Sequence, residues 1–344
     1  MAAQWWLRRA FRHAKTDAEL AALREVFQYT RDASPLTLNF GFNLAPSNNV
    51  NDGTTQEYLT FEGILTPDGL PLRFPLPADR RPLSGTEASG YIDLAYRLAS
   101  GPRHRTSLSL YLYGRTYQLS SEARAAAPEA SGSDYAYVNG DLALRHQWLL
   151  RDGLGPTSVS VSVGRVESGR EPWYRYSKVS ARQDFLLRRG QLGLGVSFED
   201  QVSQSTARAD AKVVEASAAL ALKTAQGGIW RFTLQARETR SFLDSETFQE
   251  AYASASVTPA WRVFGALPTV TLGLGAKDFD SFVLDLKGQR DDRIASLGLS
   301  LRLDGVNVMG FSPVFNVVGT RTRSNIAQYD TKAVEASLGL HSQF

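Results

Sequence analysis

Several things are missing from this sequence of 344 residues, and each absence removes a class of protein. Cysteine is absent, which excludes a disulfide scaffold and cysteine-ligated metal sites. No run of about 18 or more apolar residues occurs, which excludes a transmembrane helix. Neither positive nor negative charge dominates, because the net charge is only +3 and the charges are interspersed. We therefore expect no nucleic-acid partner.

An apolar leader is also missing. Residues 1–15 carry basic side chains but lack the apolar segment of a secretory signal peptide. A protein of the bacterial outer membrane must be exported, so for such a protein we expect that the true N-terminus has been trimmed or misassigned. The alternative at this stage is that the chain is not a membrane protein.

The C-terminal segment alternates between apolar and polar side chains. One parity contains Leu338, Leu340 and Phe344, and the other contains Glu335 and Ser337. A period of two predicts a strand with one apolar face and one polar face. A last strand that ends on an aromatic residue is typical of outer-membrane barrels, so we interpret Leu338, Leu340 and Phe344 as a barrel-assembly signal read by barrel-assembly machinery.

The same alternation recurs along most of the chain. The mean hydropathy is only −0.25, which suits strands that place every second side chain in lipid. The pattern predicts fourteen strands, at 36–45, 87–99, 104–118, 134–149, 157–166, 172–186, 190–200, 209–223, 228–239, 247–260, 267–278, 291–304, 312–323 and 330–344. Of these, 172–186 is poorly patterned.

The connections between these strands alternate in length. Short, turn-like connections such as 100–103 and 224–227 alternate with longer polar ones such as 46–86 and 119–133. This asymmetry is typical of outer-membrane barrels, and an even strand count places both termini on the short-turn, periplasmic side. Because an open sheet edge is costly in hydrocarbon, the last strand must pair with the first.

The predicted fold is therefore all-β, a transmembrane antiparallel β-barrel of about 14 strands in the cell outer membrane. The barrel spans 34–344. Residues 1–33 form an N-terminal helical segment, in which Thr16 and Glu19 make a capping box. A soluble all-β protein is the alternative, although it would not place polar side chains so regularly on the face that should be its core.

Charged side chains gather on the inward parity. The candidate lumen-lining residues are Arg97, Arg115, Asp141, Arg145, Arg231, Arg237, Arg302 and Glu335. One hypothesis is a charged conduit for an extended client. The favoured one is an ion-pair lattice that braces the barrel, with Asp93, Asp141 and Glu335 as acidic partners, because buried charges need partners.

The connection 46–86 is the longest and has an alternation of its own. Tyr58 and Phe61 precede a turn at Asp68 and Gly69, and Phe74 follows, so we expect a small hairpin. It is the candidate gating loop, folded into or over the lumen; an extracellular flap without a gating role is an equal alternative.

Catalysis is not expected. The four histidines form no convincing triad with a serine and an acid, and neither metal-ligand spacing nor a phosphate-binding glycine loop occurs. We therefore predict no enzyme activity, no cofactor and no metal.

Two segments resemble a known family, the surface lipoprotein assembly modifiers of Gram-negative bacteria. One is the entry into the barrel, a helix over 20–29, a strand over 36–44 and then Ala45-Pro46-Ser47-Asn48-Asn49-Val50-Asn51. The other is the final hairpin, with Gly310-Phe311-Ser312-Pro313, Arg323-Ser324-Asn325-Ile326, Tyr329, Gly339 and Phe344.

The resemblance implies a fourteen-stranded outer-membrane barrel that assists translocation or surface display of proteins, lipoproteins in particular. Its implied partners are outer-membrane lipids, the barrel-assembly machinery and a client surface lipoprotein or secreted protein. The family's periplasmic helical-repeat domain has at most a remnant in 1–33, because one repeat of that type needs about 34 residues. The alternative function is a passive porin-like channel for small solutes.

Overall fold

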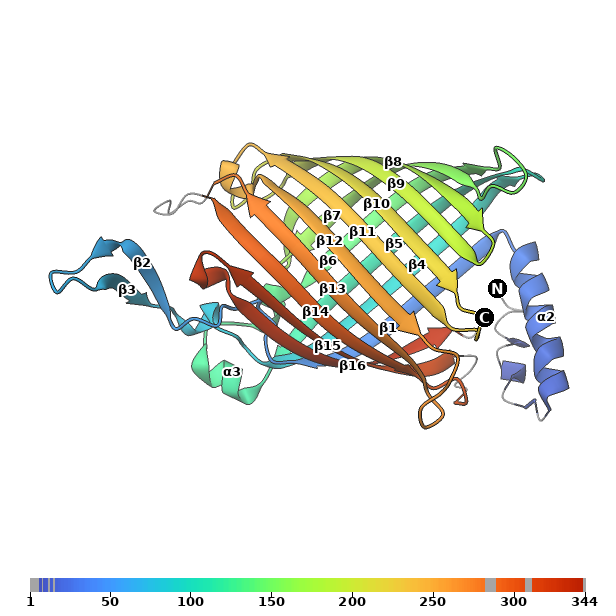
Figure 1. Cartoon of the computed structure of the whole chain (residues 1–344), viewed down its shortest axis with the longest axis horizontal. Coiled ribbons are helices and arrows are strands. Elements are labelled where there is room, and N and C mark those ends of the chain that lie inside the picture. Colours follow the sequence, from blue (N-terminus) through green and yellow to red (C-terminus); the bar gives the residue numbers. More distant parts are fainter. Residues whose placement is uncertain are drawn as a thin grey trace.

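Fourteen antiparallel strands close into a single barrel in the computed structural model (Figure 1), which describes residues 6–7, 9–11, 13–14, 16–281, 289–306 and 311–342. Each strand pairs with its neighbour in the chain, and β1 closes the cylinder against β16. The strands are β1 (Leu36–Ser47), β4 (Gly85–Ser100), β5 (His104–Leu119), β6 (Tyr137–Trp148), β7 (Thr157–Ser168), β8 (Glu171–Leu187), β9 (Gly190–Ser203), β10 (Ala211–Lys223), β11 (Ile229–Ser241), β12 (Phe248–Thr258), β13 (Leu267–Phe279), β14 (Arg290–Arg302), β15 (Phe311–Ser324) and β16 (Thr331–Ser342).

The predicted strands are confirmed one by one, and their boundaries differ by a few residues. The largest shifts are three residues, at the end of β9, which was expected at residue 200 and is at Ser203, and at the start of β6, which was expected at residue 134 and is at Tyr137. The reason is local: Gly132–Tyr135 forms a 3₁₀ helix, η2, whose capping box joins Ser131 to Asp134. That short helix uses the backbone groups that an earlier strand start would have paired with β5.

The outer face of the barrel is an apolar belt. Side chains of the predicted outward parity are exposed there, among them Phe42 (57%), Leu297 (61%) and Leu338 (61%). A water-soluble protein does not expose a continuous ring of large apolar side chains, whereas lipid is their proper solvent. Closure removes the unpaired edges that hydrocarbon would not tolerate. The barrel therefore spans a membrane, and the soluble alternative is wrong.

The two ends of the barrel differ, as the connection lengths predicted. The N- and C-terminal parts of the chain lie at the end with short turns, together with helix α2 (Asp17–Ala33) (Figure 1). The Thr16–Glu19 capping box of α2 is present, and Phe27 on this helix is buried. In the described part of the chain, no helix has the length and apolar character needed to cross a membrane.

The long-loop end carries additional structure. The connection from β1 to β4 contains the hairpin β2 (Tyr58–Leu65) and β3 (Pro71–Pro75), followed by the 3₁₀ helix η1 (Ala78–Arg80). The connection from β5 to β6 contains helix α3 (Ser121–Ala126), and later connections contain η3 (Asp244–Glu246) and η4 (Ala327–Tyr329). Val50, Leu83, Leu119, Ala123 and Ala127 form a small apolar core that joins the first two of these connections.

Candidate functional site

The predicted lumen residues lie on the parity opposite to the apolar belt. Asp141 accepts a hydrogen bond from the Tyr176 hydroxyl across the sheet, at 3.2 Å. Arg145 lines a hollow in the lumen wall, of about 360 Å³, together with serines of β7 to β10. Arg97 has another role, because its guanidinium donates to the carbonyl oxygens of Ala33 and Ser34 at the end of α2, at 3.3 and 3.0 Å.

The predicted ion-pair lattice does not form. Among the described residues, Arg115, Arg145, Arg231 and Arg237 make no ion pair, neither with Asp93, Asp141 or Glu335 nor with another acid. The expectation assumed that lumen charges are buried, and Arg145 and Arg231 are instead exposed to the lumen, where water screens them.

The ion pairs that do occur in this region are local in sequence or join adjacent strands. Arg302 pairs with Asp304 two residues later, at 2.6 Å, and Arg182 pairs with Asp184 at 2.8 Å. Lys178 on β8 lies 3.6 Å from Glu199 on β9. Arg115, Arg145, Arg231 and Arg237 therefore leave positive charge without an ion-pair partner along the lumen, among the described residues.

Two asparagines give the segment after β1 a fixed shape. The Asn49 side chain is 3% exposed, donates to the carbonyl of Gly53 and accepts from the Gly53 N–H, at 2.9 and 2.7 Å. The Asn51 amide donates to the carbonyls of Asp79 and Arg81, both at 2.8 Å. A Cβ at Gly53 would lie 2.4 Å from the Arg81 backbone, so the two legs of the connection touch at a glycine.

The Asp52 carboxyl, in the same segment, has a shifted pKa. It adopts φ +50, a left-handed conformation that Asp tolerates better than most residues. Burial raises the pKa of the Asp52 carboxyl, and the positive charge of Arg115 opposes that shift in part. Burial likewise raises the pKa of the Tyr135 hydroxyl in η2, with Asp79 and Asp134 adding to the effect. The base of the long connection is thus packed against the lumen wall.

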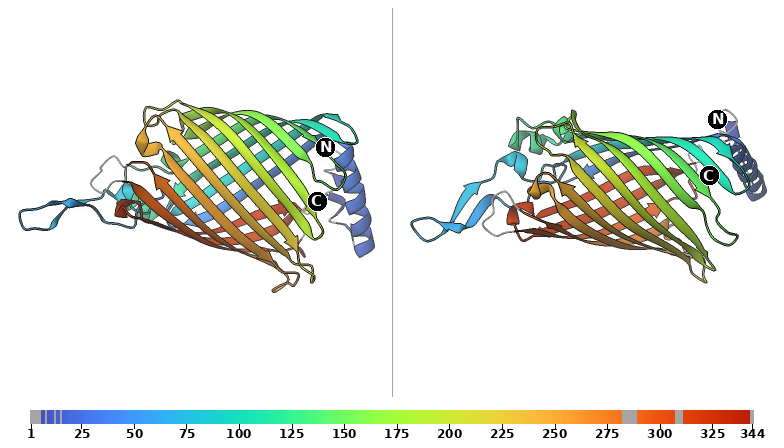
Figure 2. Two further views of the ribbon diagram at one scale, coloured as in Figure 1. Left: turned by 45° about the horizontal axis from the view of Figure 1, so that its top comes forward. Right: turned by 90° about the horizontal axis from the view of Figure 1, so that it is seen from above.

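The hairpin of this connection is confirmed, and of its two expected positions it takes that of a flap outside the lumen. Phe61 packs edge-on against Phe74, with 5.9 Å between ring centroids, and Gly69 in the turn has φ +78. The register pairs Tyr58 with Pro75, and Asp68 lies in the turn. The hairpin extends away from the barrel in all three views (Figures 1 and 2), so the base of the connection, rather than the hairpin, lies at the mouth. A gating role for the hairpin stays a prediction.

The seam that closes the barrel is sparsely paired. Among the described residues, β1 and β16 are paired at Asn43–Gly339, Leu44–Leu338 and Ser47–Glu335. On its other side, β1 pairs with β4 along its whole length, from Leu36 to Ser47. The paired positions lie in the half of β1 nearest the long-loop end. Pro46 contributes to the sparse pairing of β1 with β16, because proline has no N–H to donate to a β-ladder.

Side chains and loop backbone hold the long-loop end of this seam. The Asn48 side chain accepts from the Val334 N–H at 2.9 Å, and the Asn49 amide donates to the Lys332 carbonyl at 3.2 Å. Further out, Thr54 forms a bridge with Thr331, and the Thr55 N–H donates to the Asp330 carbonyl at 2.8 Å. We call residues 48–55, together with their partners in residues 327–334, the seam latch.

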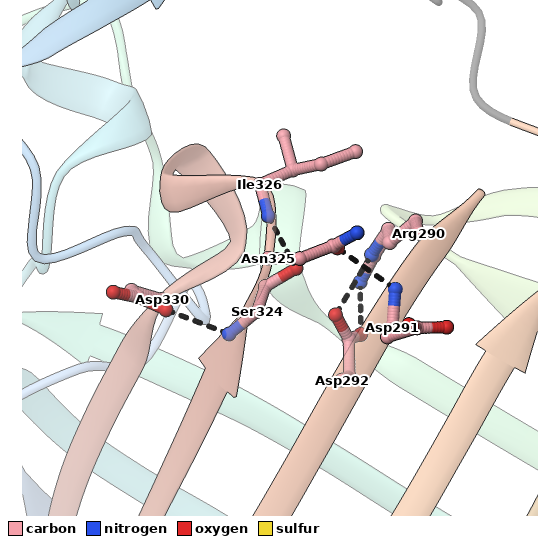
Figure 3. Close-up of polar contacts among 7 residues, drawn as sticks. All are labelled: Arg290, Asp291, Asp292, Ser324, Asn325, Ile326 and Asp330. Carbon is pink, nitrogen blue, oxygen red and sulfur yellow. Dashed lines mark hydrogen bonds and ion pairs between the residues drawn. The ribbon is translucent and has the colours of Figure 1, made fainter. Parts of the chain in front are cut away.

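The turn between β15 and β16 fixes the other side of the latch (Figure 3). Its Asn325 accepts from the Asp291 N–H at 2.8 Å, and Asp330 accepts from the Ser324 N–H at 2.7 Å. Arg290 pairs with Asp292 through two hydrogen bonds, of 2.6 and 3.1 Å, as Figure 3 shows. The same guanidinium lies 3.4 Å from the centroid of the Tyr329 ring. The β15–β16 connection is therefore anchored to β14, and it also holds residues 48–55.

Sequence reasoning missed the seam as a site. The segments 45–51 and 323–329 were noted only because they resemble a family, and the contacts of residues 48–55 with residues 327–334 depend on the closure of the barrel. Arg290 and Asp292 were not singled out, although an Arg-x-Asp pair with both side chains on one parity of a strand was a usable signal. Leu338 and Leu340 lie in the outer belt as expected, and Phe344 lies outside the described residues.

Comparisons with known proteins give structural neighbours but no family. The sequence matches no protein-family model. No curated protein matches it. Similar solved structures include CdiB from Acinetobacter baumannii (12% identity, TM-score 0.48), OccAB4 from Acinetobacter baumannii (8%, 0.41) and OprD from Pseudomonas aeruginosa (11%, 0.40). Each match covers 88% of this chain, and it covers 60%, 97% and 94% of the respective neighbour, so the chain spans well under two thirds of CdiB.

The class of the protein follows from its own geometry. A closed antiparallel barrel of fourteen strands has an apolar outer belt, a polar lumen and short turns at one end. These features together define an outer-membrane β-barrel. The localisation is accordingly the outer membrane.

Proposed function

We propose that this barrel assists the translocation or surface display of proteins, lipoproteins in particular, and that the β1–β16 seam is the lateral path for the lipid anchor. The observation that carries the proposal is the sparse pairing of that seam, which has three paired positions among the described residues. The outer-membrane lipids, the barrel-assembly machinery and a client protein are the partners that the proposal requires.

The physical reason is the chemistry of the client. A polar lumen suits an extended polypeptide, but each acyl CH₂ that entered it would lose about 0.8 kcal/mol of lipid contact. A lipid-anchored client therefore needs the barrel wall to part, so that the acyl chains stay in lipid while the polypeptide moves inside. The seam with the fewest backbone hydrogen bonds is where separating two strands costs the least free energy. The latch at the long-loop end of this seam would control whether the barrel wall opens in the outer leaflet.

The location of the resembling segments supports this proposal. The Asn-rich run that follows β1 and the Ser324-to-Tyr329 turn are parts of the two segments similar to the surface lipoprotein assembly modifiers. Both lie beside the latch, where the Asn49 amide donates to the Lys332 carbonyl and the Thr54 hydroxyl donates to the Ala327 carbonyl. The segments that carry the resemblance thus gather around the seam that a lateral path would use.

A matched pair of cross-links tests the proposal, and the cysteine-free sequence makes it clean. Leu44→Cys with Leu338→Cys would lock the closing seam, and Leu194→Cys with Ala218→Cys would lock an ordinary seam. Both pairs are direct cross-strand neighbours on the outer face. Candidate lipoproteins are co-expressed with each variant, and their surface exposure is scored by protease accessibility before and after reduction.

We expect the first lock to abolish display and reduction to restore it, while the second lock has no effect. Equal display with both locks would rule out the lateral path. If the barrel itself made no difference to display of any co-expressed lipoprotein, the translocation role would be rejected.

A passive channel is the second candidate, and the unpaired lumen arginines favour it. Arg145, Arg231 and Arg237 would attract small anions and would need no moving seam. Planar-bilayer recordings separate the two functions, because a porin conducts steadily and is indifferent to the seam lock. Steady, anion-selective conductance without any effect of the barrel on lipoprotein display would favour the channel. The absence of enzyme activity stays a prediction.

A further inference from the structure

A second hollow lies inside the barrel at the long-loop end, away from the seam. It has a volume of about 260 Å³ and is formed where the six strands β8 to β13 reach the loops, with Arg208 added by the connection from β9 to β10 and Glu246 by the connection from β11 to β12. We call this hollow the mouth pocket. Tyr174, Phe248 and Phe279 supply its aromatic lining, and Arg208, Arg237 and Thr239 supply polar groups.

The polar groups of the mouth pocket are buried donors without partners. The Nε atoms of Arg208 and Arg237 and the hydroxyl of Thr239 have no hydrogen-bond partner in the described part of the chain. Thr239 is 5% exposed, so water reaches its hydroxyl poorly. Buried donors are normally satisfied, and three that line one cavity indicate a ligand with several acceptor atoms.

Among the described residues, neither guanidinium group of the pocket is neutralised by an ion pair. Arg208 is held in place, because it lies over the Tyr174 ring, 4.2 Å from its centroid, and donates to the Gln201 side chain. A guanidinium group presents forked donors to a phosphate or carboxylate.

Two of the nearby carboxylates are already engaged. Glu246, which lines the pocket, accepts from the Ala209 N–H and the Ser241 hydroxyl, at 3.2 and 3.1 Å. Glu199 accepts from the Gln201 amide at 2.6 Å and pairs with Lys178. Glu250 on β12 is the cross-strand neighbour of both Arg237 and Lys277, and the Nζ of Lys277 lies 3.7 Å from the Phe248 centroid. Charges of both signs therefore surround the pocket, and its unpartnered donors are what it offers to an anion.

We propose that the mouth pocket binds a small organic anion, a phosphate or carboxylate carried on a sugar-sized body. The oxyanion would accept from Arg208, Arg237 and Thr239, and the body would pack against the rings of Phe248 and Phe279. The volume admits one ring and not a long chain. This site is independent of the translocation proposal.

Titration calorimetry on the full chain refolded in detergent tests the site, with glucose 6-phosphate as the probe and glucose as the uncharged reference. We expect saturable binding of the phosphate and none of glucose. Arg237→Gln and Arg208→Gln should each weaken binding at least tenfold, whereas Arg231→Gln, a lumen arginine of the same strand outside the pocket, should change it less than twofold. Thr239→Val should weaken binding several-fold.

Three outcomes would overturn the proposal. One is the absence of saturable binding at millimolar concentration, and another is an equal loss in Arg231→Gln and Arg237→Gln, which would mean general attraction to the lumen. The third is equal affinity for inorganic phosphate, which would leave no role for the ring. Heat-modifiable migration on gels verifies folding of each variant, and Arg208→Gln, a loop substitution, keeps the test valid if Arg237→Gln does not fold.

Discussion

The two sides of β1 show how differently one strand can be joined to its neighbours. Towards β4, all twelve residues of β1 are in register with a partner. Towards β16, the described residues are paired at three positions, and side chains of the latch replace the ladder at the long-loop end. The difference shows that, among the described residues, closure of this barrel rests on three paired positions and the contacts of the latch, whereas the opposite side of β1 has continuous backbone pairing.

The strongest test of that difference removes the anchor of the latch. Arg290→Gln would leave Asp292, 3% exposed, as a buried charge without its bidentate partner. Removing one member of a buried ion pair costs about 3–5 kcal/mol, so we expect the long-loop end of strands β14 to β16 to become markedly less stable. Urea unfolding of the barrel in lipid vesicles measures the loss.

The same strand offers a matched control. Arg293→Gln breaks an exposed pair with Asp278, whose two side chains are 61% and 56% exposed, and such pairs are worth about 0–1 kcal/mol. Equal losses from Arg290→Gln and Arg293→Gln would show that burial at the latch carries no special weight.

A smaller effect is expected from crowding the base of the long connection. Gly53→Ala would place its Cβ 2.4 Å from the Arg81 backbone, and overpacking of this kind costs about 1–3 kcal/mol. Gly319→Ala on β15 is the control, because its Cβ would meet nothing within 4 Å. We expect faster hydrogen exchange over residues 48–55 in Gly53→Ala alone, and protection unchanged in both variants would contradict this packing.

A smaller effect still concerns the charge of Asp52. Burial raises the pKa of Asp52 in the folded state, so the protonated form is favoured and folding stability should increase as pH falls through that pKa. Asp52→Asn, which also tolerates the left-handed backbone, removes the titration. We expect Asp52→Asn to melt above the parent chain at pH 7.5 and the gap to narrow towards pH 5. If Arg115 dominates instead, the parent chain will be the more stable at pH 7.5.

The smallest effect is expected at the hairpin. Deleting residues 58–75 removes β2 and β3 but keeps Asn49, Asn51 and Gly53, which hold the base. Single-channel conductance should be unchanged, because the hairpin extends away from the mouth (Figure 2). A large rise in conductance would restore the gating role that the sequence suggested.

Alternation predicted the strands because it is a local property of the chain. Even β8, whose outward positions include the polar Arg175, Ser177 and Gln183, was placed correctly by its neighbours and its short turn. Helix α3 was missed, because six residues leave almost no periodic signal. The direction of the hairpin depends on packing around Asn51. The alternation of apolar and polar residues in the sequence gives no information about that packing.

The site could be predicted less well than the fold. Inward parity identified Arg115 and Arg237 as lumen residues, but parity gives no distances, so it could not tell whether an acidic side chain lies within ion-pair reach of either arginine. The latch joins residues about 280 positions apart, such as Asn49 and Lys332, so it exists only after closure. The mouth pocket likewise gathers side chains from six strands and two connections.

Hydrogen–deuterium exchange of the folded barrel in nanodiscs, read at single amides by NMR, tests the central claim most directly. If β1 and β16 are joined mainly at the latch, the amides of β1 that precede Asn43 and face β16 should exchange much faster than the amides of β4 and β5. The amides of β16 that face them should exchange equally fast. Amides of β16 that face β15 should stay protected and serve as the internal reference. Equal protection of the amides on both sides of β1 would contradict the account.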